Sequence, residues 1–348
     1  MGSRVITAAV ESKPLGASLA ARWRYYRRIL PAYLGSGRSQ LTFWHEVPEI
    51  SAGVESTARE TGQHLGAYYM SFREKADYAG ALDDSGIPML DYRGAIGLQY
   101  NPIAIAQWGL GNFNLFRISA DQTRLHRTLN AADWLVSDLE QNVHGLWVWH
   151  HHFDWEYRST LRAPWYSGLA QGQGVSLLLR AHQQTGIEKY REAAGRAFVS
   201  LKTPISEGGV LFEDYEQNLW IEEYLVEPPT HILNGFMWAL WGVFDFWIAT
   251  SDPWAKRVFD RGVATLLHNL PRYDVGYWSL YEQSGTWLKM MASPFYHRLH
   301  IVQLRVMASL TGDQQFAEAA DRWETYARRW TNRIRALAEK SVFKLVHY

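Results

Sequence analysis

The sequence repeats a helical pattern about every 65 residues, and this repeat restricts the fold more than any other feature. Apolar or amphipathic segments end at a glycine or a small polar residue, and an Asp or Pro follows at the start of the next segment. These junctions are 117–121, 184–187, 250–253 and 310–313. The pattern predicts one supersecondary unit, a helical hairpin, that recurs along the chain.

The two helices of each predicted hairpin differ in composition. The first helix is uniformly apolar, whereas the second spaces its apolar residues among charges, as Trp134, Leu135 and Leu139 do. We therefore expect a mainly α protein, an α/α toroid in which about four first helices form an inner ring of an incomplete barrel. The expected first helices are 101–118, 166–185, 231–249 and 295–310, and their partners are 121–142, 187–202, 253–269 and 313–338.

Aromatic-rich, alternating stretches between the helical pairs predict short β-hairpins. They are 145–155, 208–224 and 275–282, with 90–100 as a fourth candidate. The three later stretches leave a second helix and lead into a first helix, so they should gather at one end of the toroid. This rim is expected to collect Tyr100, Trp165, Tyr166, Glu223, Tyr224, Tyr281, Tyr296 and His297.

The N-terminal region reads differently from the repeats. Helices are expected over 18–34 and 55–79, and we divide the chain into a helical or irregular extension, 1–95, packed on a toroidal catalytic domain, 96–340. Inside the second expected first helix, the spacing Gly168-x-x-x-Gly172-x-Gly174 favours close helix packing over phosphate binding.

Charge and composition exclude several classes of protein. Lys plus Arg and Asp plus Glu both number 35, so no global field favours nucleic acid or an anionic membrane, and an acidic substrate must be met by local cations. The absence of cysteine excludes thiolate chemistry and disulfides. The first residues lack the apolar core of a secretion signal, and the most apolar run, 235–250, is too short to span a bilayer. The expectation is a soluble, cytoplasmic protein without membrane insertion.

The aromatic content is high, with 17 Trp and 19 Tyr. Two interpretations stand side by side. A large helical core uses many such residues, and sugar rings pack on aromatic planes while their hydroxyls reach polar edges.

Glu223 is the main candidate for acid–base chemistry. It lies in a tract with Trp220, Tyr224 and two prolines, where partial burial would raise its pKa and favour a general base. The alternative is a hairpin wall held by a surface cation. Because alternate residues of a strand face opposite sides, only one of Glu222 and Glu223 can point at a site.

Histidine spacing gives little support for a metal. His297 and His300 are a helical i, i+3 pair without a third ligand at suitable spacing, so a satisfied polar pair or a substrate clamp is favoured over zinc. The run 150–152 would be split between two faces of a strand. Nucleotide and hydrolase fingerprints are also missing, so we expect neither a metal nor a cofactor.

Several separated motifs, in order, resemble the D-glucuronyl C5-epimerase family (heparosan-N-sulfate-glucuronate 5-epimerase-like), specifically its C-terminal catalytic domain. The resemblance runs from about Tyr100 to Arg328 and implies an α/α toroid. It is carried by Asn101-Pro-Ile-Ala-Ile-Ala-Gln107, Trp165-Tyr-Ser-Gly-Leu-Ala-Gln171-Gly172, Glu222-Glu-Tyr224, Leu233-Asn-Gly-Phe236, Leu270-Pro-Arg-Tyr-Asp274, Tyr281 and Tyr296-His297-x-x-His300.

The resemblance also implies site residues. Glu223 and Tyr296 match the family's proposed catalytic acid–base pair, Tyr224 and Tyr281 match tyrosines of such sites, and Asn234 matches a substrate-contacting asparagine. Tyr166, Ser167 and His297 fall in motifs that line the family's cleft, and Trp238 lies one helical turn beyond Asn234. One departure is that the linker between Tyr281 and Tyr296 lacks the arginine of the animal enzymes; Gln283, Ser284 and Lys289 stand there instead.

The implied activity is a C5-epimerase, an isomerase that converts D-glucuronate to L-iduronate residues in an acidic polysaccharide such as heparosan or heparan sulfate. The C5 proton lies α to a carboxylate, and inversion needs proton carriers on two faces of the ring. Glu223 and Tyr296 come from distant segments and suit this role. His297 or Arg298 is expected to lower the pKa of Tyr296.

Alternatives remain at this stage. A polysaccharide lyase shares the first proton abstraction, and a glycan-binding protein would use the aromatic hairpins without turnover. A glycoside hydrolase is less favoured because it needs two carboxylates across the bond. The resemblance and the aromatic C-terminal tail also suggest a homodimer.

Overall fold

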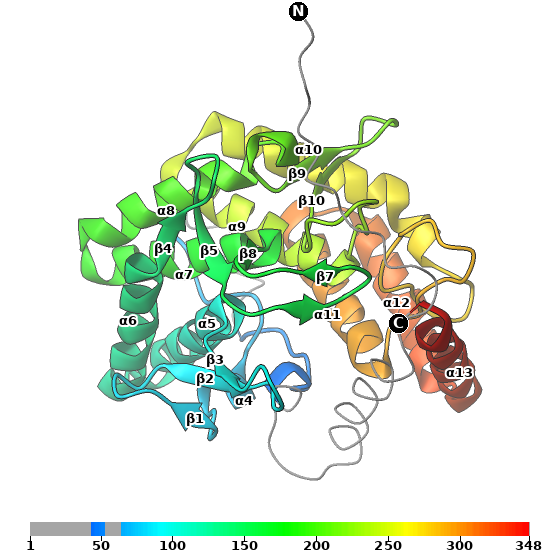
Figure 1. Cartoon of the computed structure of the whole chain (residues 1–348), viewed down its shortest axis with the longest axis horizontal. Coiled ribbons are helices and arrows are strands. Elements are labelled where there is room, and N and C mark those ends of the chain that lie inside the picture. The colour runs from blue at the N-terminus through cyan, green and yellow to red at the C-terminus, as the bar shows by residue number, and fades with distance from the viewer. Residues whose placement is uncertain (1–42, 53–63, 348) are drawn as a thin grey trace, which may run out of the picture.

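The computed structural model describes residues 43–52 and 64–347, and in this part of the chain it confirms the mainly helical α/α toroid. Helices α5, α7, α9 and α11 pack one against the next, and each packs against the helix that follows it, which lies outside (Figure 1). The pairs are α5 (Pro102–Ser119) with α6 (Gln122–Ser137), α7 (Gly168–Thr185) with α8 (Glu188–Leu201), α9 (Leu233–Thr250) with α10 (Pro253–Asn269), and α11 (Pro294–Thr311) with α12 (Gln314–Arg328).

Burial distinguishes the inner helices from the outer ones. Every residue from Gly168 to Ala181 in α7 and from Leu233 to Phe246 in α9 is buried, whereas the outer helices bury one face. Glycines let α7 and α9 approach closely, because a Cβ on Gly172 would lie 2.6 Å from the Cα of Ala239. The predicted role in helix packing is confirmed for Gly172, whereas Gly168 lies against Glu222 and Ile221 and Gly174 against the ring of Trp149.

Helix ends follow the sequence signals. The side chains of Asp121, Asp252 and Asp313 accept hydrogen bonds from backbone N–H groups in the first turns of α6, α10 and α12. Gly186 and Gly312 end α7 and α11 in the left-handed conformation that glycine adopts without strain. The repeat junctions therefore lie where the sequence places them.

Short strands precede the inner helices. β4 (Leu139–Gln141) pairs with β5 (Trp147–His151), which also pairs with β8 (Trp165–Tyr166), and β9 (Leu211–Glu213) pairs with β10 (Leu219–Ile221). The remaining strands are β1 (Ala81–Leu82), β2 (Pro88–Asp91), β3 (Leu98–Gln99), β6 (Trp155–Glu156) and β7 (Thr160–Leu161). In Figure 1, β5, β8 and β10 lie over the ring of inner helices, so one rim of the toroid carries them.

Three predicted elements differ in the structure. The helix predicted over 121–142 ends at Ser137, because β4 begins at Leu139 and joins the hairpin. The helix predicted over 313–338 is broken at Arg329, whose extended backbone separates α12 from α13 (Trp330–His347). The segment 275–282 makes only isolated bridges, with 3-10 helix η2 (Leu270–Tyr273) before it; another 3-10 helix, η1 (Ile205–Glu207), precedes β9.

The helix predicted over 55–79 is wrong for residues 64–79, where only α4 (Arg73–Ala76) is helical. Asn114 of α5 gives the reason. Its side chain accepts a hydrogen bond from the N–H of Tyr68 and donates to the carbonyls of Tyr68 and Met70, so this backbone pairs with α5 instead of with itself. The rest of that prediction, and the helix expected over 18–34, lie outside the described residues.

The described part of the N-terminal region packs on the inner helices. The ring of Phe72 lies 6.3 Å from that of Trp238 on α9, and Tyr69 lies 5.2 Å from Trp241. Across residues 43–52 and 64–347, we find no helix that combines the length and apolar character needed to cross a membrane.

Candidate active site

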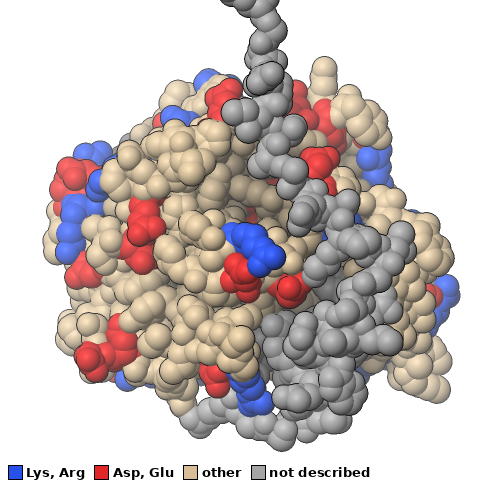
Figure 2. Space-filling view, in the orientation of Figure 1, with Lys and Arg blue, Asp and Glu red and all other residues tan. Residues whose placement is uncertain are grey.

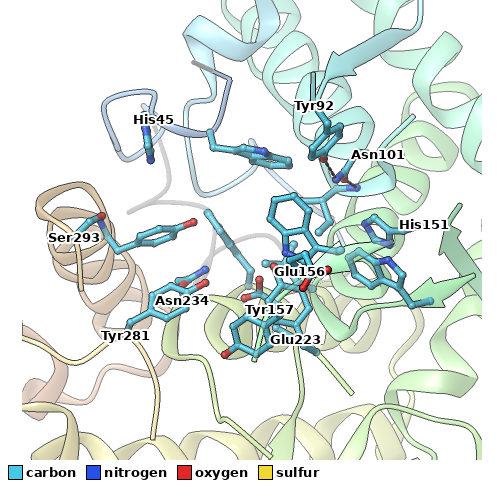
Figure 3. Close-up of a pocket in the computed structure, with 18 of the residues that line it drawn as sticks. His45, Tyr92, Asn101, His151, Glu156, Tyr157, Glu223, Asn234, Tyr281 and Ser293 are labelled. Atoms are coloured by element: carbon cyan, nitrogen blue, oxygen red, sulfur yellow. Dashed lines mark hydrogen bonds between the residues drawn. The ribbon is translucent and has the colours of Figure 1, made fainter. Parts of the chain in front are cut away.

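The strand-bearing rim contains a cavity of about 220 Å³. Figure 3 shows side chains entering it from the N-terminal segment, the hairpins and the starts of the inner helices. In Figure 2 this face is hollowed near its centre, and acidic and basic side chains are interspersed over it. Its lining includes Tyr92, Asn101, Gln107, Phe153, Trp155, Tyr157, Trp165, Glu223, Tyr224, Asn234, Trp238, Tyr281 and Tyr296.

Two adjacent glutamates follow β10 and face opposite ways. Glu222 accepts hydrogen bonds from the backbone N–H and the ring of His231, so its carboxylate is satisfied in the wall of the toroid. Glu223 lines the cavity instead. The predicted alternation is therefore correct, and the tertiary structure identifies Glu223 as the residue that faces the site.

Glu223 lies in a dry, tight environment. Its side chain is 5% exposed, and its Oε2 has no hydrogen-bond partner within the described residues. Burial raises its pKa to about 8; a hydrogen bond with Tyr224 opposes the shift, and Glu222 and Glu282 add to it. Gly235 makes room for the carboxyl group, because a Cβ there would lie 2.1 Å from Oε2. A carboxyl group with such a pKa can take or return a proton near neutral pH.

Two tyrosines form the wall at the start of α11. Ser293 caps this helix by accepting a hydrogen bond from the N–H of Tyr296, which fixes the position of that residue. The rings of Tyr296 and Tyr281 meet edge to face, 4.8 Å apart. Burial raises the pKa of Tyr281 well above its usual value, and the charge of Glu223 raises it further, so this phenol stays protonated.

Tyr224 is held beside Glu223 by other aromatic residues. Its ring lies 4.6 Å from that of Tyr157 and 5.8 Å from that of Trp165. The hydroxyl of Tyr157 donates to Glu282, whose other carboxylate oxygen lies 3.1 Å from the Nε of Arg158. This chain of contacts fixes the phenol side of the cavity.

Several polar atoms at the cavity lack a hydrogen-bond partner among the described residues. They are Oδ1 of Asn234, Nε1 of Trp238 and both ring nitrogens of His151. The ring of His151 stacks on Trp165 at 3.8 Å, and burial lowers its pKa to about 3, so it is neutral. Because buried polar groups are ordinarily paired, these atoms are suited to hydroxyl groups of a bound ligand.

Other predicted site residues do not line the cavity. Tyr166 donates its hydroxyl to the carbonyl of Gly208, Ser167 is buried at the start of α7, and Arg298 is exposed. Tyr100 is also outside it and donates to Asp83. Tyr100 and Tyr166 were predicted at the rim from their position in the chain, Ser167 from the family resemblance and Arg298 as a cation beside Tyr296.

His297 differs from the prediction most clearly. Its ring is fully buried, stacks on Trp278 at 3.8 Å, and contacts Ser279 and the carbonyl of Trp323 through its two nitrogens. Burial lowers its pKa to about 4, so it is neutral. It therefore cannot act as the cation expected beside Tyr296, and it packs α11 against its neighbours.

Several lining residues carried no sequence signal. Lys340 and Lys344 come from α13, beyond the last predicted repeat. Trp44 and His45 come from the N-terminal region. The i, i+4 spacing of the two lysines puts them on one helix face, but only the fold shows that this face meets the cavity.

The fold and the cavity define an α/α toroid with a buried carboxyl group and two phenols at one rim. The profile of the D-glucuronyl C5-epimerase C-terminus matches residues 141–325, more than half of the chain. The chain belongs to the D-glucuronyl C5-epimerase family.

Curated relatives match part of the chain, and a solved structure shares its fold. The chain is 34% identical over 218 residues to D-glucuronyl C5-epimerase of Caenorhabditis elegans, covering 58% of this chain and 35% of that protein. It is 28% identical over 198 residues to an uncharacterized protein of Methanocaldococcus jannaschii, covering 56% of this chain and 63% of that protein. The chain thus spans less than two thirds of either relative. A crystal structure of D-mannose isomerase shares the fold with a TM-score of 0.51 and 10% identity, over 74% of this chain and 68% of that one.

Proposed function

We propose that this protein is a C5-epimerase, an isomerase that interconverts D-glucuronate and L-iduronate residues within an acidic, heparosan-like polysaccharide. One observation supports this most: the carboxyl group of Glu223 and the phenols of Tyr281 and Tyr296 reach one cavity from different elements. Inversion at carbon needs proton carriers on two faces of the sugar ring, and groups that enter a cavity from different elements suit this requirement.

In the proposed mechanism, one carrier removes the C5 proton, and the electron pair of the C5–H bond moves onto the carboxyl group of the uronate. A group on the opposite face then gives a proton to C5, and the configuration inverts. Glu223, with a pKa of about 8, serves as base or acid according to which epimer is bound. Tyr296, supported by Tyr281, is the opposite carrier.

The charge that develops on the substrate carboxyl group needs nearby donors or cations. Asn234 and Trp238 border the cavity with unpaired polar atoms, and aromatic rings from β8 and the N-terminal segment offer faces for sugar rings. These features support an extended carbohydrate as the ligand.

The test is incubation of the protein with a panel of uronans in heavy water, followed by nuclear magnetic resonance of the product. Epimerisation places deuterium at C5 and produces the other epimer. A rise in ultraviolet absorbance from an unsaturated product would instead identify a lyase, and binding without either change would identify a glycan-binding protein. Absence of C5 deuterium with every uronan would overturn the proposal.

A further inference from the structure

The cavity has a cationic side that the matched family region does not supply. Among the described residues, the Lys and Arg side chains that line the cavity are Lys340 and Lys344, and both belong to α13. Helix α13, at the red end of the chain in Figure 1, begins after the matched range of 141–325. This helix therefore adds a feature of its own to the site.

The Lys340 ammonium is buried with few partners. Its side chain is 8% exposed, and its Nζ donates to the carbonyl of Met291 at 2.9 Å. No carboxylate of the described chain lies within 4.0 Å of it. An ammonium has three N–H donors, and burying a charge costs free energy unless it is paired. The site therefore has capacity for an anion that the described protein does not provide.

The other cations considered from the sequence are not available at the cavity. Arg298 and Lys289 are exposed and do not line it, and His297 is buried and neutral. A uronate carries one carboxylate beside the reacting carbon, and this carboxylate gains charge as the C5 proton leaves. The ligand chemistry and the buried ammonium are complementary.

We propose that Lys340 binds the carboxylate of the reacting uronate and sets the preference for uronates over neutral sugars. This inference rests on the proposed function. The Nζ of Lys340 lies 5.5 Å from the centre of the Tyr281 ring, and Tyr281 contacts Tyr296. Because one C–C bond separates the carboxylate from C5, an anchor at Lys340 keeps C5 beside the phenol pair.

The charge of this anchor depends on pH. Burial lowers the pKa of Lys340 to about 7, and Lys344 lowers it further, whereas Glu282 opposes the shift. Tyr281 is adjacent, and the charge of Lys340 also acts on His45 and His300. Above this pH the amine of Lys340 loses its proton and no longer attracts a carboxylate. The preference for uronates should therefore weaken as pH rises above 7.

The experiment compares the full chain with Lys340→Met, Lys340→Arg and the control Lys256→Met, which removes an exposed lysine of α10. Calorimetry at pH 6 and pH 8 measures the Kd of a glucuronate-containing oligosaccharide and of its carboxyl-reduced counterpart. We expect Lys340→Met to weaken binding of the uronate about 10- to 100-fold, as the loss of a charged hydrogen bond does, and to leave binding of the reduced sugar unchanged. At pH 6, Lys340→Arg should bind the uronate with a Kd within about threefold of the wild type. It should keep this affinity at pH 8, where the wild type loses affinity, because a guanidinium stays charged.

An equal loss for both ligands in a Lys340→Met variant with the wild-type unfolding midpoint would overturn the inference, as would no loss for either. Lys340→Gln replaces that variant if it does not fold. Deuterium exchange at C5 by the wild type separates the two proposals. If the wild type exchanges deuterium at C5 and Lys340→Met keeps the preference for uronates, only the role of Lys340 is refuted. A wild type that neither exchanges nor prefers the uronate refutes both.

Discussion

The two ends of the toroid bury polar groups in different ways. Toward the C-terminal ends of α7 and α9, Arg180 and Asp245 form a buried ion pair at 2.6 Å, and the hydroxyl of Tyr69 also donates to Asp245 at 2.6 Å. At the strand-bearing rim, Glu223 and Asn234 keep buried oxygens without a partner in the described chain. The first end satisfies its charges internally, whereas the second leaves hydrogen-bonding capacity for a ligand.

The two ends therefore differ in whether their buried polar groups are paired within the protein. A buried pair such as Arg180–Asp245 is costly to break. A buried carboxyl group without a charged partner shifts its pKa instead, as Glu223 does. Substitutions at the two ends should therefore affect different properties.

The largest expected effect is the loss of turnover in Glu223→Gln. The variant keeps the shape of the side chain but can no longer carry a proton, so C5 deuterium exchange should fall about 10²- to 10⁴-fold. The control is Glu213→Gln, on the outer part of the same hairpin, where Glu213 is exposed and pairs with Arg261. Exchange within about tenfold of the wild-type rate would remove Glu223 from the mechanism.

At the other end, Asp245→Asn should act on stability. Removing one partner leaves the buried Arg180 unpaired, which costs about 3–5 kcal/mol of unfolding free energy. Urea unfolding measures the loss, and the folded fraction should keep its exchange rate. Asp260→Asn, which removes an exposed i, i+4 pair with Lys256, should cost no more than about 0.5 kcal/mol. A similar cost at both sites would contradict the comparison.

The pH dependence of stability gives a smaller effect at the strand-bearing rim. The pKa of Glu223 is raised from 4.5 in the unfolded chain to about 8 in the folded one. Between these pH values the folded chain holds a proton that the unfolded chain has lost. Glu223 therefore makes the free energy of unfolding fall as pH rises from 4.5 to about 8, and it has no further effect on the pH dependence above that range. Glu223→Gln should remove this fall, and its stability advantage should grow up to pH 8. Parallel stability curves for the two proteins would be inconsistent with the raised pKa.

The smallest expected effect concerns the space beside Glu223. Gly235→Ala places a methyl group against Oε2, so the carboxyl group must move and exchange should fall about tenfold. Gly195→Ala on α8 has open space around the new Cβ and should stabilise the protein by about 0.5–1 kcal/mol with normal exchange. Equal exchange rates in the two variants would show that the carboxyl group tolerates displacement.

Much of the scaffold was predictable because its signals are local. Helix caps such as Asp252 and Gly312 act within one turn of the helix. The inner helices are uniformly apolar, whereas the outer helices space their apolar residues among charges, and this difference can be read from the sequence. The errors arise where a distant partner decides. Asn114 binds the backbone near Tyr68, and Leu139 joins a hairpin that a local pattern cannot anticipate.

The site was predicted in part for the same reason. Glu223, Tyr281 and Tyr296 were found because motifs at separate strand ends and helix starts meet at one rim of a toroid. His297 was misplaced because a helix start fixes the backbone position but not the face on which a side chain lies. Lys340 was missed because α13 follows the last repeat and its packing against the cavity is a tertiary contact.

The sequence by itself determined the repeat, the capped starts of the outer helices and the opposite orientation of Glu222 and Glu223, since these depend on local sterics and periodicity. The tertiary structure decided which carboxyl group is buried without a cation, and that a C-terminal lysine meets the same cavity. Burial and charge pairing depend on contacts between segments that are far apart in the chain. The pKa of Glu223 and the environment of Lys340 therefore exist only once the toroid is assembled.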